Sequence, residues 1–480
     1  MQNYPPPRYL IVNSPPEQNS PAKVLRPSIT GSIVLLISAM LTYVSLASYS
    51  AQAKPSVAAQ QAAIYIGIGL LASIILDLRQ GWRNLFRIDL LCLASLYGLT
   101  LLEFLFPQPS FNQSLATVES IIAAIHAVLL GITGIVIGRH LGKRKALKLR
   151  FLNFSQLQNK QILSLFLLAS LLGFLWMLIS VNFDLLRLIS AMTGPRFGEP
   201  WARGRLGGIT SLLSELRLLL LLVPALFGII MTRFRTFPKG WFLIASIILG
   251  LTFLQGFSSG TRSILVMYTA SLLAGYLLNL SRNTFKNTVI PIGIAVIFLY
   301  FCTYHMLQFR TIGLTAYLAG YREGFLSDTF FVDYNLMSLG QVIEAMPERH
   351  GFLGWEVFYW ALVRPIPRVL FPLKPEGLSV SIEQIVGAEG WTVATTYLGE
   401  SYMAGGWLMI FVVSLGIGIF TAWWNRISVQ TYSAYSMLLY ASGFAAAAIT
   451  MRSLFEFTTA MLPVLALILY PRFIDRSLRG

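Results

Sequence analysis

Long apolar stretches constrain this chain more than any other feature. About twelve stretches of 17 to 24 mostly apolar residues occur in its 480 residues, and each is close to the ~20 residues that a helix needs to cross a ~30 Å hydrocarbon core. We therefore expect an all-α integral membrane protein with about twelve transmembrane helices. The expected spans are 30–50, 59–78, 88–106, 119–138, 161–181, 209–231, 241–257, 263–281, 288–308, 404–424, 432–450 and 455–471.

The composition excludes an ordinary soluble globule. Hydrophobic residues make up 55% of the chain and charged residues only 12%, which is far from the usual balance of a soluble domain. The two cysteines, Cys92 and Cys302, lie inside expected spans. A disulfide framework and a cysteine metal site are therefore not expected.

The basic residues show which side of the membrane each connection occupies. When the spans are threaded from a cytoplasmic N-terminus, 22 of the 36 basic residues fall on the inner side, against four acids, Glu17, Asp77, Asp89 and Asp475. This is the positive-inside pattern. It predicts that both termini are cytoplasmic, and it assigns the net charge of +16 to membrane orientation, which argues against nucleic acid as a partner.

The threading divides the chain into four parts. Residues 1–28 contain seven prolines and are expected to be a disordered cytoplasmic tail. Residues 29–308 hold nine spans and an outer loop at 182–208. Residues 309–403 form a large aromatic outer loop, which we expect to contain short helices along the membrane interface and a re-entrant piece. Residues 404–480 hold three spans and a cytoplasmic C-terminus.

The outer face is rich in arginine. Of the 14 basic residues on that side, 12 are arginine, and insertion does not require them. Converging arginines suit a pyrophosphate, because each planar guanidinium can bind two phosphate oxygens. The alternative for each is a contact with a lipid headgroup or with an outer acid. The candidates are Arg196, Arg203, Arg205, Arg262, Arg310, Arg364, Arg368 and Arg452.

The strongest candidates for a functional arginine lie in two short connections, since a tight turn between membrane helices fixes the depth of its side chains in the membrane. They contain Arg262, after Gly260-Thr261, and Arg452, before Ser453. Among the outer acids, Glu400 lies just before a span and is the first candidate for a general base. An ion pair with an arginine is the alternative role for Glu400, and Asp333 in the large loop is the weaker candidate base.

Several motifs together resemble those of the bacterial O-antigen and oligosaccharide repeat-unit polymerases. They include the Gly260-Thr261-Arg262 turn, Pro367-Arg368 followed by Pro372-Leu373-Lys374-Pro375, and Gly399-Glu400-Ser401-Tyr402. Arg196 and Gly207, with ten residues between them, also fit a pattern of outer loops in this family. The resemblance extends over most of the chain from about residue 160 onward.

The resemblance implies glycosyl transfer at the outer leaflet of a bacterial inner membrane, by a GT-C-like enzyme. A glycan on undecaprenyl pyrophosphate would be the donor, and a second lipid-linked repeat unit would be the acceptor. A chain-length regulator is a further partner that the resemblance admits. No cofactor is expected, and no metal either, because residues 51–58 contain no acid and no Asp-x-Asp lies outside.

Two other functions remain open from the sequence. An O-antigen ligase would share the layout and the arginines, and would be expected to use a histidine of the large outer loop, where His350 is available. A flippase or other transporter of lipid-linked oligosaccharides would also have about twelve spans. An outer loop of this size has little use in a transporter.

Overall fold

The computed structural model describes eight segments of the chain. They are residues 25–49, 54–106, 117–142, 157–201, 213–280 without 214, 284–321, 334–429 without 369, 386 and 388–392, and 434–477. Within these segments every regular element is a helix. The all-α fold expected from the sequence is therefore confirmed.

Helices of very different lengths follow one another along the described segments. In chain order they are α1 (Ile29–Leu46), α2 (Pro55–Leu78), η1 (Trp82–Phe86), α3 (Ile88–Thr100), η2 (Leu102–Leu105), α4 (Val118–Leu141), α5 (Asn159–Ser180), α6 (Leu185–Thr193), η4 (Arg196–Gly198), η5 (Leu216–Leu221), α8 (Leu222–Thr232), η6 (Phe234–Thr236), α9 (Lys239–Ser258), α10 (Arg262–Leu278), α11 (Phe285–Leu318), α12 (Asn335–Ala345), α13 (Glu356–Val363), α14 (Ile382–Ile385), α15 (Thr396–Trp424), η7 (Ile427–Val429), α16 (Ala434–Arg452), α17 (Leu454–Ala460) and α18 (Leu462–Ser477).

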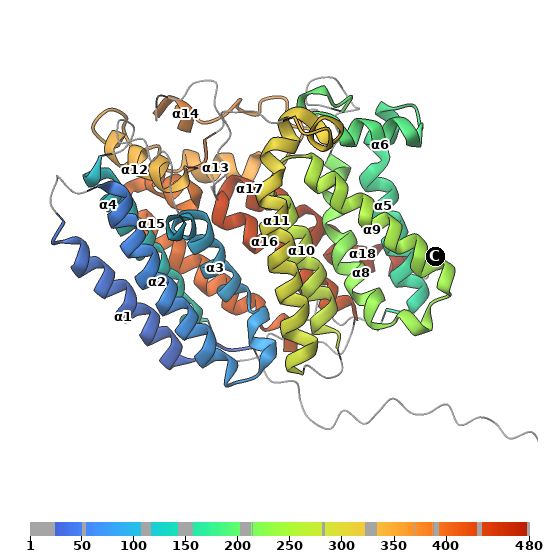
Figure 1. Ribbon diagram of the computed structural model, residues 1–480, viewed down its shortest axis with the longest axis horizontal. Coiled ribbons are helices and arrows are strands. Elements are labelled where there is room, and N and C mark those ends of the chain that lie inside the picture. The colour runs from blue at the N-terminus through green and yellow to red at the C-terminus, as the bar shows by residue number, and fades with distance from the viewer. Residues whose placement is uncertain are drawn as a thin grey trace, which may run out of the picture.

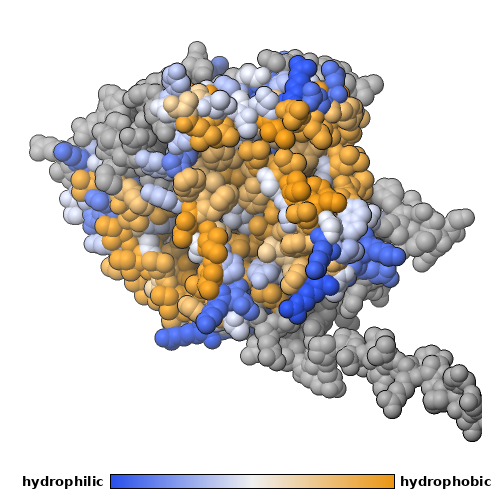
Figure 2. Space-filling view, turned by 45° about the vertical axis from the view of Figure 1, so that its right-hand side comes forward, coloured by the Kyte–Doolittle hydropathy of each residue, from blue (hydrophilic) through white to orange (hydrophobic). Residues whose placement is uncertain are grey.

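Eight helices in the described segments are long and apolar enough to cross a membrane: α1, α2, α4, α5, α9, α11, α15 and α16. Four shorter apolar helices, α3, η5 with α8, α10, and α17 with α18, occupy the positions of the other expected spans. A membrane protein is thus supported, and the number twelve stays a prediction. Figure 2 shows the matching surface, a hydrophobic band between hydrophilic residues at its upper and lower edges.

The helices form two groups that meet in the middle of the molecule. In Figure 1, α1 to α4 and α15 lie on the left, α5, α8 and α9 lie on the right, and α10, α11 and α16 stand between them. The helices α6, α12, α13 and α14 gather at one end, which we call the loop end. Helix α16 is buried along most of its length, so the two groups pack around it.

Small residues allow the closest helix contacts. A Cβ added to Gly138 of α4 would lie 2.3 Å from the Leu415 carbonyl oxygen of α15, and one added to Gly275 of α10 would lie 2.3 Å from the Ala225 carbonyl oxygen of α8. Membrane helices pack in this way because lipid offers no hydrophobic drive for association, so van der Waals contact at short range must stabilise the pair.

A buried charge network ties the helices together at the end opposite the loop end. The Arg87 guanidinium lies 2.7 Å from the Asp77 carboxylate and 3.1 Å from that of Asp89, and Arg139 lies 3.3 Å from Asp89. The Asn425 amide donates to Asp89 at 2.7 Å. The charges balance and are buried, which stabilises this end only while all partners are present. The end of α2, the start of α3 and the end of α4, which the sequence assigns to the inner side, therefore lie together.

In the large loop, whose helices we expected along the interface, α12 packs against the bundle. Its position relative to a membrane stays a prediction. Leu336, Leu339 and Val342 are fully buried, and Gly340 approaches the Ser120 backbone of α4 so closely that an added Cβ would lie 2.6 Å from its oxygen. The apolar face of α12 was too short to be recognised as a packing surface. Helix α13 keeps Trp355, just before it, 73% exposed.

The helices on either side of that loop extend beyond the boundaries expected at 308 and 404. Helix α11 continues to Leu318 with a kink at Gly313, and α15 begins at Thr396 and breaks at Gly405 and Gly406. Gly406 has φ +67° and ψ −152°, a conformation that essentially only glycine adopts. The Met403 carbonyl next to the break accepts a 2.8 Å hydrogen bond from the Leu353 amide.

The first part of α15 folds back against the second. The Tyr397 and Ser414 hydroxyls are 2.9 Å apart, whereas seventeen residues of straight helix would span about 25 Å, far more than a tyrosine side chain can bridge. The segment Thr396–Ala404 therefore forms a short helix that returns into the bundle. The sequence predicts a re-entrant piece in the large loop, and whether this segment enters a membrane stays a prediction.

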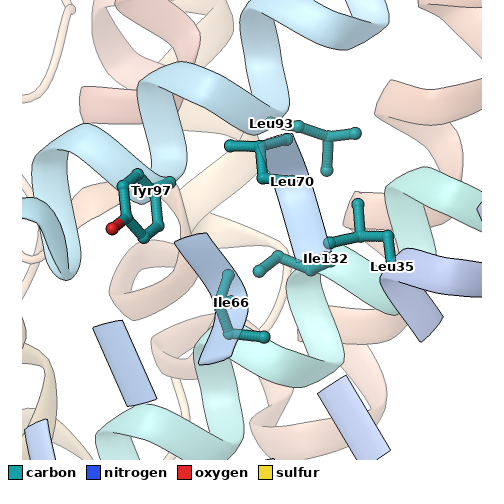
Figure 3. Close-up of a pocket in the computed structure, with 6 residues that line it drawn as sticks. All are labelled: Leu35, Ile66, Leu70, Leu93, Tyr97 and Ile132. Atoms are coloured by element: carbon teal, nitrogen blue, oxygen red, sulfur yellow. The ribbon is translucent and has the colours of Figure 1, made fainter. Parts of the chain in front are cut away.

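An apolar gap among α1 to α4 is part of the core and not a site. Leu35, Ile66, Leu70, Leu93, Tyr97 and Ile132 line it (Figure 3). It is too small to admit a water molecule, and the one hydroxyl that borders it, that of Tyr97, donates to the Ala63 carbonyl at 3.0 Å.

Candidate functional site

Glu400 lies in the fold-back segment of α15 and is only 3% exposed. One carboxylate oxygen accepts a 2.5 Å hydrogen bond from the Ser453 hydroxyl, and the other accepts a 2.6 Å bond from the Leu454 amide. The expected alternative for Glu400 was an ion pair with an arginine. Its closest partners in the described residues are instead a hydroxyl and a backbone amide.

The local sequence explains why those partners are available. Ser453 has an extended backbone between α16 and α17, and its hydroxyl accepts from the Phe455 amide at 3.1 Å as an N-cap. The first amides of a helix have no partner within the helix. The Leu454 amide is one of these, and the Glu400 carboxylate satisfies it.

One predicted arginine acts on this carboxylate, and a second adjoins its partner Ser453 in the chain. Arg452 ends α16 immediately before Ser453, and its guanidinium is 3.3 Å from the Glu456 carboxylate one turn along. Arg364 follows α13 and lies near enough for its charge to act on Glu400. Helix α13 is held there by a 2.5 Å hydrogen bond from the Thr458 hydroxyl to the Ala361 carbonyl. Glu400 and Arg364 therefore lie near each other, and Arg452 is linked to the same region through Ser453 and Glu456.

The other predicted arginines are not all in this place. Arg368 is exposed and lies 3.6 Å from the exposed Glu376, so it does not belong to the buried site. Arg262 begins α10 after the predicted turn, which the structure confirms with Gly260 at φ +63°. The side chain of Arg310 in α11 lies outside the described residues, as do Arg203, Arg205 and Asp333.

Arg196 belongs to a second polar cluster at the loop end. It begins η4 close to Glu199, whose carboxyl receives a hydrogen bond from the Trp201 side chain and also feels the charge of Arg217. The Arg217 guanidinium lies over the Trp176 ring, 5.8 Å from its centroid. Burial raises the pKa of Glu199 to about 7, against the opposing effects of Trp201 and the two arginines.

Sequence reasoning missed part of this second cluster. Arg217 falls inside the span expected at 209–231 and was counted among the outer arginines, but it was not among the candidate site residues. Glu199 lies in the loop at 182–208, from which only arginines were chosen as candidate residues. The available signal was the short Glu199-Pro200-Trp201 segment, which places a carboxylate beside an indole donor.

A cavity of about 330 Å³ lies next to the second cluster, between the end of α6 and the outer part of α11. Thr193, Gly194 and Pro195 form one wall, and Ile312, Gly313 and Ala316 contribute to the other. The lining is mainly apolar. Arg196 follows Pro195 directly in the chain, so a charged residue adjoins an apolar space.

Comparisons with protein-family models, with curated proteins and with solved structures found no match for this chain. Within the part of the chain that the structure describes, no three histidine, cysteine, aspartate or glutamate side chains are grouped as metal ligands would be. The candidate function therefore depends on the geometry of the site and on its sequence motifs.

The arrangement at Glu400 is suited to proton transfer beside a bound anion. A buried carboxylate can accept a proton from a hydroxyl that reaches it, and guanidinium groups such as those of Arg364 and Arg452 can neutralise charge on a departing phosphate group. Ser453 and Leu454 fix the carboxylate in position.

Proposed function

We propose that this protein is a GT-C-like glycosyltransferase that joins lipid-linked oligosaccharide repeat units into a polysaccharide. The substrates would be two glycans on undecaprenyl pyrophosphate, in the outer leaflet of a bacterial inner membrane that the chain crosses about twelve times with both termini in the cytoplasm. The observation that carries the proposal is the buried Glu400 carboxylate, which is hydrogen-bonded to Ser453, lies within the influence of the Arg364 charge, and is joined through Ser453 to the chain next to Arg452.

The proposed step forms one bond and breaks one. A hydroxyl oxygen of the acceptor repeat unit attacks the anomeric carbon of the donor glycan, and the bond from that carbon to the pyrophosphate oxygen breaks. The hydroxyl proton goes to Glu400. The electron pair of the broken bond leaves with undecaprenyl pyrophosphate, where arginine side chains would stabilise the charge that develops.

The location of the site supports this step. A lipid pyrophosphate stays at the membrane interface while its glycan extends beyond it, so a transferase needs its arginines near helix ends. Arg452 ends α16, Arg262 begins α10, and Arg364 follows α13. The folded-back segment of α15 holds the Glu400 carboxylate at a fixed position among these helix ends. An ordinary connecting loop would leave such a carboxylate mobile.

The test is an assay of purified protein in liposomes with a lipid-linked repeat unit. With the repeat unit alone, products with two or more joined units are expected. If glycan is transferred only after lipid A core is added, the protein is a ligase and the role of base would move toward His350. If the repeat unit crosses the bilayer without chemical change, the protein is a transporter.

A further inference from the structure

We propose that the cavity between α6 and the kinked part of α11 binds the isoprenoid segment that adjoins the pyrophosphate of a lipid-linked substrate. This inference rests on the proposed function for the choice of substrate, and it names where the lipid part of that substrate docks. Four features of the structure support it. They are the helix kink beside the cavity, the level of the cavity relative to the membrane interface, its size and lining, and the charged residues next to it.

The kink in α11 creates the cavity. Gly313 has φ +81° and ψ 166°, a conformation that a residue with a side chain rarely adopts. A Cβ there would lie 3.0 Å from the Gly194 carbonyl carbon and from the Pro195 nitrogen. Across the kink, His305 and Tyr317 are joined by a hydrogen bond between the ring and the hydroxyl. The bend is thus fixed on both sides, and the cavity opens beside it.

The neighbouring helix indicates that the cavity lies at the membrane interface. Helix α6 is short, and its side chains Leu185, Leu186 and Ile189 are 63%, 81% and 43% exposed. Leu188 and Met192 of the same helix are buried against the protein. Exposed leucines on a short helix at the end of a membrane bundle are typical of a helix that lies in the interface plane. A lipid chain would enter the cavity at this level.

The size and lining fit one segment of a long apolar chain. The volume of about 330 Å³ is at the lower end of small-molecule pockets, which span roughly 300–1,000 Å³. An undecaprenyl chain is too large to fit inside, but its first isoprene units could be held while the rest remains in the bilayer. The polar groups among the lining side chains are the hydroxyls of Thr193, Thr315 and Tyr321.

The neighbouring charge distinguishes this cavity from a general lipid crevice. Arg196 directly follows the wall residue Pro195, and Arg217 lies in the same cluster, since both act on Glu199. Guanidinium groups bind phosphate oxygens, and because Arg364 and Arg452 would meet the pyrophosphate of the donor, the two arginines of this cluster would meet that of the acceptor. Because the pKa of Glu199 is about 7, its carboxyl is partly protonated at neutral pH and opposes an anion less than an ordinary glutamate would.

The experiment uses a geranylgeranyl pyrophosphate that carries a photoreactive benzophenone on the isoprene unit next to the pyrophosphate. The full-length protein in nanodiscs is irradiated with this probe, and the labelled peptides are identified by mass spectrometry. Label is expected within residues 191–201 and 312–321. Unlabelled geranylgeranyl pyrophosphate should displace the probe, whereas phosphatidylglycerol at the same concentration should not.

Two variants fill the cavity from different positions. Ala316→Phe and Thr315→Trp should each reduce labelling at least tenfold, and Thr315 is exposed, so its variant is the less demanding for folding. Leu318→Phe is the matched control, since Leu318 is 73% exposed on the same helix and outside the cavity lining. It should label like the wild type.

Labelling elsewhere, equal displacement by phosphatidylglycerol, or unchanged labelling in both cavity variants would overturn the inference. The labelling assay requires no glycosyl transfer, so the two proposals fail separately. If the probe labels the cavity while no polymer forms with a lipid-linked repeat unit, the site stands and the proposed function fails. If polymer forms with an unchanged KM in both cavity variants, the function stands and the site fails.

Discussion

Glu400 accepts a 2.5 Å hydrogen bond from Ser453, although 53 residues separate them in the sequence. This bond joins the fold-back segment of α15 to the break between α16 and α17. Because Arg452 immediately precedes Ser453, the bond also ties the end of α16 to the segment that carries Glu400. The candidate site therefore depends on the glycine break that returns α15 into the bundle.

Gly406→Ala should destabilise the protein, because an alanine cannot adopt the backbone of Gly406 without strain of about 1–3 kcal/mol. The Phe352 ring, 3.1 Å from an added Cβ, adds to the cost. Thermal unfolding in detergent would measure the change. Gly416→Ala in the same helix is the control, since nothing lies within 4 Å of its added Cβ, and it should be neutral or slightly stabilising. Equal unfolding temperatures for the two variants would contradict this account of the break.

Arg262→Lys, Arg310→Lys and Arg452→Lys should each lower chain growth roughly tenfold to a hundredfold while protein levels stay unchanged, because lysine cannot replace a bidentate hydrogen bond to phosphate worth about 1.5–3 kcal/mol. The rate of polymer formation in liposomes is the measurement. Arg349→Lys, an exposed position at the loop end, should retain the wild-type rate. Normal polymerisation by all three variants would exclude a pyrophosphate clamp.

The stability contribution of Glu199 should depend on pH. Its pKa is raised from about 4.5 to about 7 in the folded protein, so the folded state holds this proton more tightly than the unfolded state does. The contribution is complete below pH 4.5 and is lost as the pH rises through 7. Compared with Glu199→Gln, the wild type should thus lose thermal stability between pH 5 and pH 8. A difference between the two proteins that stays constant over this range would show that Glu199 is an ordinary surface acid.

The predicted orientation can be tested with single cysteines. Thr193→Cys and Glu376→Cys, both at the loop end, should react with an impermeant reagent in intact cells. Gln80→Cys, exposed at the other end, should react only after lysis. The native Cys92 and Cys302 are buried and should give little background. The reverse pattern would place the candidate site in the cytoplasm and exclude the proposed reaction.

Hydropathy alone located the bundle, because a membrane span needs only length and apolar composition, which are local properties. All twelve expected spans coincide with apolar helices, eight of them long enough to cross a membrane. The turn before Arg262 was also predictable, since Gly260 supplies the positive φ that a tight turn requires. Glu400 lies near Arg364, whereas the convergence of all the outer arginines on one cavity stays a prediction.

What could not be predicted depends on contacts between distant residues. Asp77, Asp89, Arg87 and Arg139 were counted only as inner charges, yet they neutralise one another in one buried network. Arg368 looked equivalent to Arg364 in sequence, but only the latter is turned toward Glu400. The fold-back of α15 depends on the backbone conformations of Gly405 and Gly406. These could not be predicted, because glycine permits many conformations without selecting one.

The role of Glu400 tests the central claim most directly, with chain growth from a lipid-linked repeat unit as the measurement. Glu400→Gln keeps the size of the side chain and removes the base, and Ser453→Ala removes a hydrogen bond to Glu400 but leaves its carboxylate. We predict that Glu400→Gln reduces turnover by about 10²–10⁴-fold while donor binding survives, and that Ser453→Ala reduces it less than tenfold. Full turnover by Glu400→Gln, or equal losses in the two variants, would contradict a catalytic carboxylate at this position and would move the role to Asp333 or His350.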